Sequence, residues 1–83
     1  MKYKIIILKR AARYIEKQPP EMQERLLKAI YRLPAGDVKA MKKYQNLYRL
    51  RVGKARVIYS VDGETITITV TDAGNRGQIY NRY

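Results

Sequence analysis

Cysteine, histidine, tryptophan and phenylalanine are absent from this 83-residue sequence. Without cysteine the chain has no disulfide framework and no thiolate metal site, and we expect a reducing cytoplasm as its compartment. Without histidine it has no imidazole acid–base pair, no catalytic triad and no histidine metal ligand. These absences exclude much of the usual catalytic chemistry.

Long apolar runs are also missing. The first residues, MKYKIIILKR, contain an apolar stretch too short for a signal peptide or a membrane span, and charged residues follow it directly. We therefore expect a first strand over residues 2–8 and no membrane association. The chain length suits a single domain over residues 1–83.

Acidic residues are scarce, and their positions do not suit a metal site. The seven Asp and Glu residues fall on predicted helix surfaces or turns with no metal-ligand spacing, which argues against a two-metal nuclease. No glycine-rich phosphate-binding motif is present. The sequence therefore predicts no metal and no cofactor.

Basic residues dominate the charge. Eighteen Lys and Arg give a formal net charge of +11, which attracts nucleic acid, acidic membranes or acidic proteins. No acidic residue occurs from Val38 to Val61, a window that contains Lys39, Lys42, Lys43, Arg49, Arg51, Lys54 and Arg56. This cluster is either a solvated surface or a binding patch.

The first half of the chain predicts a strand followed by two helices. From Lys9 apolar residues recur at helical spacing until the QPP segment ends the pattern. A second helix begins at Pro20, which suits a first helical turn, and continues to about Leu33. In the following loop, we expect Val38 and Met41 to contact the core.

The second half alternates with period two. Residues 46–52 and 55–61 predict a hairpin with Arg49, Arg51 and Arg56 on one face. After a turn at Asp62-Gly63, Ile66, Ile68 and Val70 alternate with Thr65, Thr67, Thr69 and Thr71. We predict an α+β fold of order β-α-α-β-β-β, a two-helix hairpin on one face of a four-stranded, mainly antiparallel sheet with an open, basic opposite face.

The side chains left for chemistry are arginine, lysine and tyrosine. Guanidinium groups bind phosphate and stabilise charge that develops during phosphoryl transfer, and RNA supplies its own 2′-hydroxyl nucleophile. A metal-free nuclease is therefore chemically feasible. The tyrosines are the only aromatics. We expect four of them to pack in the fold, namely Tyr3, Tyr31, Tyr48 and Tyr59, and Tyr80 to differ because the C-terminal tail has little else to bury.

The segment YRLRVGKARVIYSV, a further strand and then GNRGQIY resemble the RelE/ParE toxin superfamily, and most closely RelE-type mRNA interferases, over nearly the whole chain. The resemblance implies a toxin of a type II toxin–antitoxin system that cleaves mRNA in the ribosomal A site through 2′-hydroxyl attack. It also implies a RelB-like antitoxin, an acidic or helical segment that wraps around the toxin. By position it implies that Arg49 and Arg51 hold the mRNA and that Arg56 and Arg76 bind and stabilise the scissile phosphate. It also implies that Tyr80 orients the nucleotide.

Three positions depart from the best-known RelE pattern. Arg49 and Arg51 stand where those enzymes carry lysine, and Asn75 stands where many relatives carry histidine. Because arginine does not readily release a proton, we expect Lys54 or Tyr80 to serve as the general base instead. Weaker RNA contacts are assigned to Lys39, Lys42, Lys43 and Arg82. Two alternatives remain: a ParE-like gyrase inhibitor, and a degenerate toxin that only binds its antitoxin.

Overall fold

The computed structural model describes residues 3–63 and 67–83. Over these ranges the chain forms eight elements in the order β1 (Lys4–Ile7), α1 (Lys9–Glu16), α2 (Pro20–Tyr31), β2 (Val38–Ala40), β3 (Leu47–Val52), β4 (Ala55–Asp62), β5 (Thr67–Asn75) and α3 (Arg76–Arg82). Parts of the predicted first and last strands, at Lys2, Thr65 and Ile66, lie outside the described residues.

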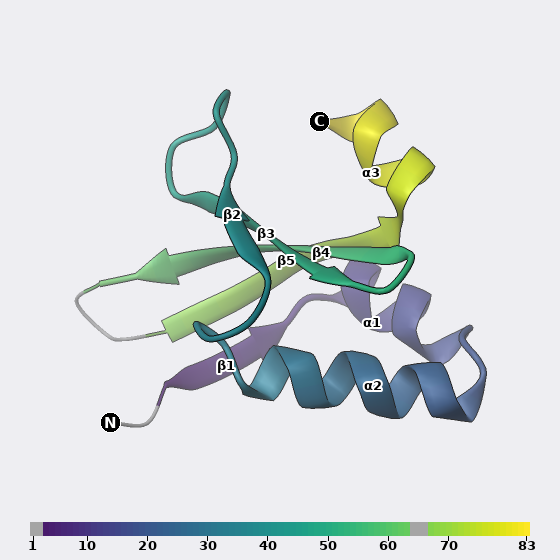
Figure 1. Cartoon of the computed structure of the whole chain (residues 1–83). Helices are drawn as coiled ribbons and strands as arrows, with labels where there is room; N and C mark the ends of the chain where they lie inside the picture. Colours follow the sequence, from purple (N-terminus) through teal and green to yellow (C-terminus); the bar gives the residue numbers. More distant parts are fainter. Residues whose placement is uncertain (1–2, 64–66) are drawn as a thin grey trace.

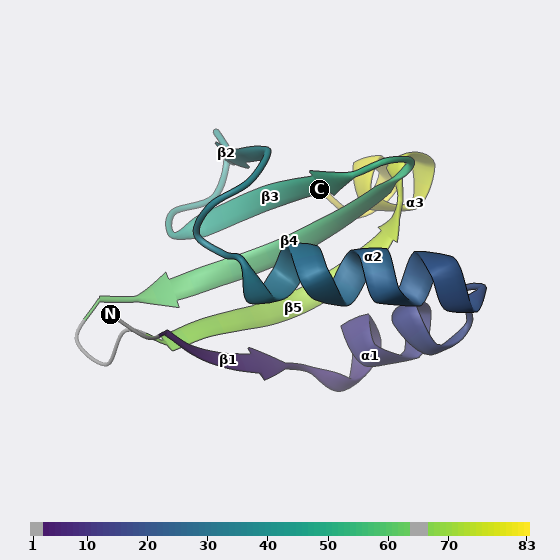
Figure 2. The same ribbon diagram turned by 60° about the horizontal axis from the view of Figure 1, so that its bottom comes forward.

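The strands of the described chain form one five-stranded sheet in the order β1-β5-β4-β3-β2. β1 pairs with β5 in parallel, and the other neighbouring strands pair antiparallel. Helices α1 and α2 lie together on one face of this sheet (Figure 1, Figure 2). The predicted α+β class, with a helical pair on one face of a mainly antiparallel sheet, is therefore confirmed.

The predicted strand count of four is corrected to five. The additional strand, β2, pairs antiparallel with β3 and aligns Val38 with Leu50. Val38 packs against the core as predicted, whereas Met41, predicted to do the same, is not among the described residues that pack there. A strand of three residues is too short to show an alternating pattern, so its sequence did not distinguish it from a loop.

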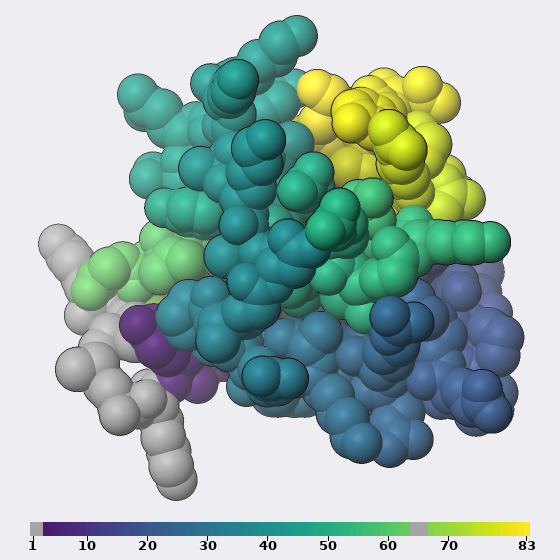
Figure 3. Space-filling model, in the orientation of Figure 1, coloured from purple at the N-terminus to yellow at the C-terminus, as the bar shows by residue number. Residues whose placement is uncertain are grey.

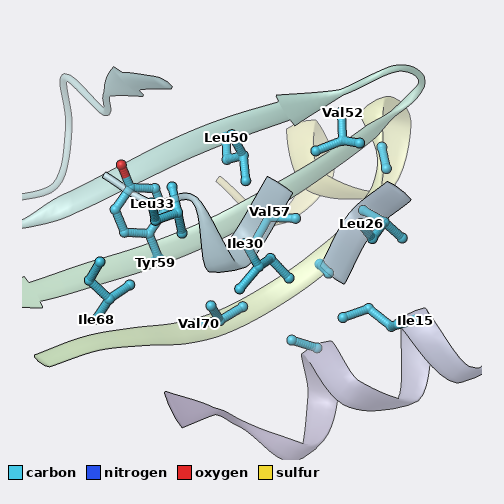
Figure 4. Close-up of a cluster of buried hydrophobic side chains, with 13 residues drawn as sticks. Ile15, Leu26, Ile30, Leu33, Leu50, Val52, Val57, Tyr59, Ile68 and Val70 are labelled. Carbon is cyan, nitrogen blue, oxygen red and sulfur yellow. The ribbon is translucent and has the colours of Figure 1, made fainter. Parts of the chain in front are cut away.

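The core lies between the helical pair and the sheet. Ala11 and Ile15 of α1 and Leu26 and Ile30 of α2 are buried at the helical spacing that the sequence predicted. They meet apolar side chains of β3, β4 and β5, as Figure 4 shows, including Leu50, Val52, Val57, Tyr59, Ile68 and Val70. Burial of each large aliphatic side chain stabilises the fold by about 1.5–3 kcal/mol.

The β3–β4 hairpin turns at Gly53 and positions the arginines. Gly53 has φ +58°, a left-handed backbone conformation that favours glycine. The register pairs Arg51 directly with Arg56. Two cations thus lie side by side, an arrangement that costs stability unless an anion compensates.

A β-bulge in β5 changes which side chains face the helices. Ile58 pairs with Asp72 and Tyr59 with Val70, so Thr71 is the extra residue, and its hydroxyl donates to the Ile58 carbonyl at 3.2 Å. Beyond the bulge Ala73 joins the core cluster. Asp72 therefore belongs to the opposite face of the sheet.

The predicted topology also lacked helix α3, which lies on the face opposite α1 and α2 (Figure 1). Asn75 caps it through a reciprocal capping box with Gln78. Ile79 is only 5% exposed, so the C-terminal tail does bury an apolar side chain. The face predicted to be open is thus covered at one end, and the topology becomes β-α-α-β-β-β-β-α.

Candidate functional site

A pocket of about 210 Å³ lies between α3, the β3–β4 hairpin and the segment around β2. In Figure 3 the C-terminal segment, in yellow, lies beside the teal segment that contains β2 and the loop after it. An edge-to-face contact between Tyr44 and Tyr83, with ring centroids 5.5 Å apart, joins these two segments. The pocket is lined by Lys39, Ala40, Met41, Lys42, Arg49, Arg56, Arg76, Ile79, Tyr80 and Tyr83.

Arg56 lies where the positive charges of the site meet. Its Nη1 donates to the carbonyls of Gly53 at 3.0 Å and Ala55 at 2.9 Å, which orients the guanidinium. Burial lowers the pKa of Arg56, and the charges of Arg49, Arg51 and Arg76 lower it further. A guanidinium remains charged at neutral pH, so this field favours an anion.

Arg49 has an unsatisfied donor. Its Nε is buried and has no hydrogen-bond partner in the described parts of the chain. Leaving a buried donor unpaired costs about 1–3 kcal/mol, and more for a charged group. Arg49 lines the pocket, so an anion bound there would offer the missing acceptor.

Helix α3 supplies Arg76 and Tyr80 from successive turns. The Arg76 guanidinium lies 5.4 Å from the Tyr80 ring centroid, in a cation–π contact. Tyr80 is 66% exposed, so its ring remains accessible to a stacking partner. The backbone N–H of Arg76 donates to the Lys54 carbonyl at 3.1 Å and ties the start of α3 to the hairpin turn.

The pocket brings together four of the five predicted catalytic residues: Arg49, Arg56, Arg76 and Tyr80. Arg51 is directed elsewhere, because its Nε donates to the Asp37 carboxylate at 2.6 Å. The Lys54 side chain is not among those that line the pocket, and its role as a base stays a prediction.

Among the predicted RNA contacts, Lys39 and Lys42 line the pocket, whereas Lys43 is exposed outside it. Arg82 pairs with the buried carboxylate of Asp72 at 2.7 Å. Sequence reasoning did not single out Tyr83 or Ile79, although the spacing of four residues between them is a helical signal. It also missed Asp72, which follows an alternating strand without any distinguishing pattern.

The tyrosines predicted to pack divide into two groups. Tyr59 is buried, and its ring stacks on that of Tyr48 with centroids 5.4 Å apart. Tyr31 and Tyr3 are instead 64% and 37% exposed, so the packing prediction is wrong for these two. Tyr31 directly follows the buried Ile30 at the end of α2, about 100° further round the helix, so it lies beside the buried stripe and not on it.

No helix within residues 3–63 and 67–83 is long and apolar enough to cross a membrane. In the same ranges no group of three or more acidic residues could hold a metal ion.

Solved structures with this fold define a RelE-like class of toxins. A chain of the archaeal RelE-RelB complex from Pyrococcus horikoshii matches with a TM-score of 0.77 at 28% identity, covering 94% of this chain and 99% of that one. A chain of the RelB-RelE antitoxin–toxin complex from Methanococcus jannaschii matches with a TM-score of 0.74 at 26% identity, covering 94% and 98%. The isolated Escherichia coli RelE toxin has a TM-score of 0.66 at 21% identity, covering 96% and 93%.

Family membership follows from the sequence match. Residues 7–80 match the family described as ParE toxin of type II toxin-antitoxin system, parDE. The chain therefore belongs to this family and is a toxin of a type II toxin–antitoxin system. A search of curated protein sequences found no significant match.

Proposed function

We propose that this toxin is a metal-independent endoribonuclease that cleaves mRNA in the ribosomal A site. The observation that supports the proposal is the convergence of Arg49, Arg56 and Arg76 on one pocket whose lining contains no carboxylate. Within the described residues none of these three forms an ion pair with an acidic side chain, so their charge is available to a phosphate.

The reaction needs little beyond alignment and charge stabilisation. The RNA 2′-oxygen bonds to the adjacent phosphorus as its proton leaves, and the bond from phosphorus to the 5′-oxygen breaks as that oxygen gains a proton. The products are a 2′,3′-cyclic phosphate and a 5′-hydroxyl. Arg56 and Arg76 stabilise the charge on the phosphorane oxygens, and Arg49 donates its free Nε. Tyr80 stacks on the base and orients the nucleotide.

The choice of proton acceptor is narrow. The pocket contains neither histidine nor carboxylate, and an arginine does not act as a base. The lining side chains able to exchange a proton are Lys39, Lys42 and Tyr80, because the Tyr83 hydroxyl donates to the Asp72 carboxylate. Because none of these side chains is an efficient base at neutral pH, we expect the ribosome to supply much of the in-line alignment, and cleavage should then depend on the ribosome.

We further propose a RelB-like antitoxin as the neutralising partner in the cytoplasm. The similar archaeal structures are RelE-RelB complexes. Apolar side chains also remain exposed on β1 and α2, including Ile6 at 38% and Leu27 at 36%. An antitoxin segment that covers these residues and carries acidic side chains would complement both the apolar surface and the net charge of +11.

The match to the ParE family supports a second candidate, inhibition of DNA gyrase by binding. A gyrase inhibitor would cause DNA damage in expressing cells and leave mRNA intact. A degenerate toxin that only binds its antitoxin would cause no growth arrest.

One experiment separates the three functions. The toxin is expressed without a partner, and mRNA 5′ ends are mapped on stalled ribosomes while DNA damage is followed in parallel. Cuts within A-site codons are expected, with Arg76→Ala reducing their rate about a hundredfold or more. Arg32→Ala is the matched control, since Arg32 lies at the end of α2, away from this pocket. Intact mRNA with DNA damage would replace the proposal with gyrase inhibition.

A further inference from the structure

Asp72 is a fully buried carboxylate that lies outside the pocket. In the described ranges, 3–63 and 67–83, it is the one buried charged residue, at 0% exposure. Burial of an ionised carboxylate is costly unless hydrogen bonds and opposite charges compensate it. The contacts of Asp72 therefore indicate what the residue holds in place.

Three elements meet at this carboxylate. Its Oδ1 accepts from Nη1 of Arg82 at 2.7 Å and from the backbone N–H of Ala73 at 2.8 Å. Its Oδ2 accepts a longer hydrogen bond from the Tyr83 hydroxyl at 3.4 Å, and Nη1 of Arg10 lies 3.9 Å from it. The Asp72 clamp, defined as Asp72, Arg10, Arg82 and Tyr83, thus joins β5, α1 and the C-terminal end of α3.

The clamp completes the attachment of a helix that is too short to be stable alone. Helix α3 has seven residues, well below the length at which an isolated helix forms in water. Its first turn is held by the Asn75–Gln78 capping box and its middle by buried Ile79. Its last residues are held by Asp72, and burial together with the Asp72 carboxylate raises the pKa of Tyr83, which keeps that hydroxyl protonated as a donor.

The same helix carries pocket residues. Arg76 and Tyr80 come from α3, and Tyr83 follows it in the pocket wall. Detachment of the C-terminal end of α3 would displace Tyr80 and Tyr83 and open the pocket on one side. A shift of about an ångström in a group that acts on the transition state is sufficient to reduce a rate substantially.

We propose that Asp72 is a positioning residue, which through Arg82 and Tyr83 fixes α3 in the orientation that aims Arg76 and Tyr80 at the bound phosphodiester. Its effect on cleavage rests on the proposed nuclease function, whereas its hold on α3 does not. The two parts are therefore tested by separate readouts on the same variants.

The first readout is amide hydrogen exchange in the free toxin. Asp72→Asn keeps the side-chain shape and removes the charge. Arg82→Gln removes the other partner of the ion pair, and because the Arg82 side chain is 39% exposed, this substitution leaves the buried Asp72 itself unchanged. Both variants are expected to accelerate exchange of α3 amides at least tenfold, including the Tyr83 N–H that donates to the Ile79 carbonyl, without change in β4. Arg82→Lys should stay near wild type.

The matched control is Arg13→Gln. Arg13 lines the same groove between α1 and α3 as Arg82 and loses the same charge, but it makes no contact with Asp72 among those of the described residues. The proposal that Asp72 holds α3 would be wrong if Arg82→Gln left the exchange rates of the α3 amides unchanged, or if it accelerated exchange equally in β4 and α3. A response of Arg13→Gln equal to that of Arg82→Gln would overturn it too.

The second readout is cleavage of ribosome-bound mRNA. Arg82→Gln is expected to lower kcat at least tenfold with a much smaller change in KM, and Arg82→Lys is expected to restore kcat. A kcat that stays at the wild-type level while α3 exchange rises would overturn the positioning role. If the wild-type toxin cleaves no RNA, the nuclease proposal fails while the exchange result still decides whether Asp72 holds α3.

Discussion

Replacement of Arg49 by methionine should stabilise the free toxin and inactivate it at the same time. Methionine keeps most of the unbranched apolar stem of the half-buried side chain and removes a guanidinium whose Nε is buried without a partner. The penalty for such a donor is about 1–3 kcal/mol, so its removal should raise the free energy of unfolding by about that amount. For a chain of this size each kcal/mol shifts Tm by about 4–8 °C.

Arg51→Met is the matched control, two positions along the same strand. Arg51 is paired with Asp37, and the two side chains are 53% and 49% exposed. Loss of an exposed pair costs about 0–1 kcal/mol, so this variant should be neutral or slightly less stable. The two substitutions thus remove the same group from β3, but only Arg49→Met is expected to raise the free energy of unfolding.

The assay is urea unfolding followed by circular dichroism, with mRNA cleavage measured on the same preparations. Arg49→Met should show a higher unfolding midpoint than wild type and cleavage reduced about a hundredfold or more. The reasoning is refuted if Arg49→Met is destabilised as much as Arg51→Met, because the unpaired Nε would then carry no measurable cost. It is equally refuted if cleavage persists at the wild-type rate.

Three further predictions concern other parts of the molecule. Tyr80→Ala should lose about 1–3 kcal/mol of base stacking, measured as weaker binding to a short RNA, whereas Tyr80→Phe should retain it. Lys42→Ala should reduce the slope of log K against log salt for single-stranded RNA by about 0.7, with Lys17→Ala on the opposite face of the sheet as comparison. Burial, and to a lesser extent Tyr48, raises the pKa of Tyr59. As the pH rises, the Tyr59 hydroxyl therefore loses its proton in the unfolded state before it does so in the folded state. The contribution of Tyr59 to the free energy of unfolding should therefore be fully present below about pH 10 and be lost as the pH rises through the pKa of the folded state. Tyr59→Phe should make that decline less steep, measured by urea unfolding between about pH 8 and 11.

Sequence patterns predicted the elements whose signals are local. Alternation in residues 46–61 placed Leu50 and Val57 in the core and Arg51 on the other face, and the structure agrees. Helical spacing located Ile15 and Ile30 on the buried stripes of α1 and α2. Such periodicities are set by backbone geometry within a few residues, so they can be read without knowing the rest of the chain.

Other features depended on contacts between distant segments. The partner of Arg51 is Asp37, fourteen positions earlier, and that pairing directs Arg51 away from the pocket while Arg49 stays in it. The bulge at Thr71 of β5, opposite Ile58 and Tyr59, turns Asp72 toward α3, and no local pattern in the β5 sequence predicts it.

The composition of this chain alone excluded histidine, thiolate and disulfide chemistry, and its alternation established a sheet with arginines on one face. Which arginines share a pocket, and that a buried carboxylate holds the helix beside them, was decided only when the strands and α3 came together. An ion pair or a hydrogen bond acts over a few ångströms of space, and separation along the chain does not determine that distance.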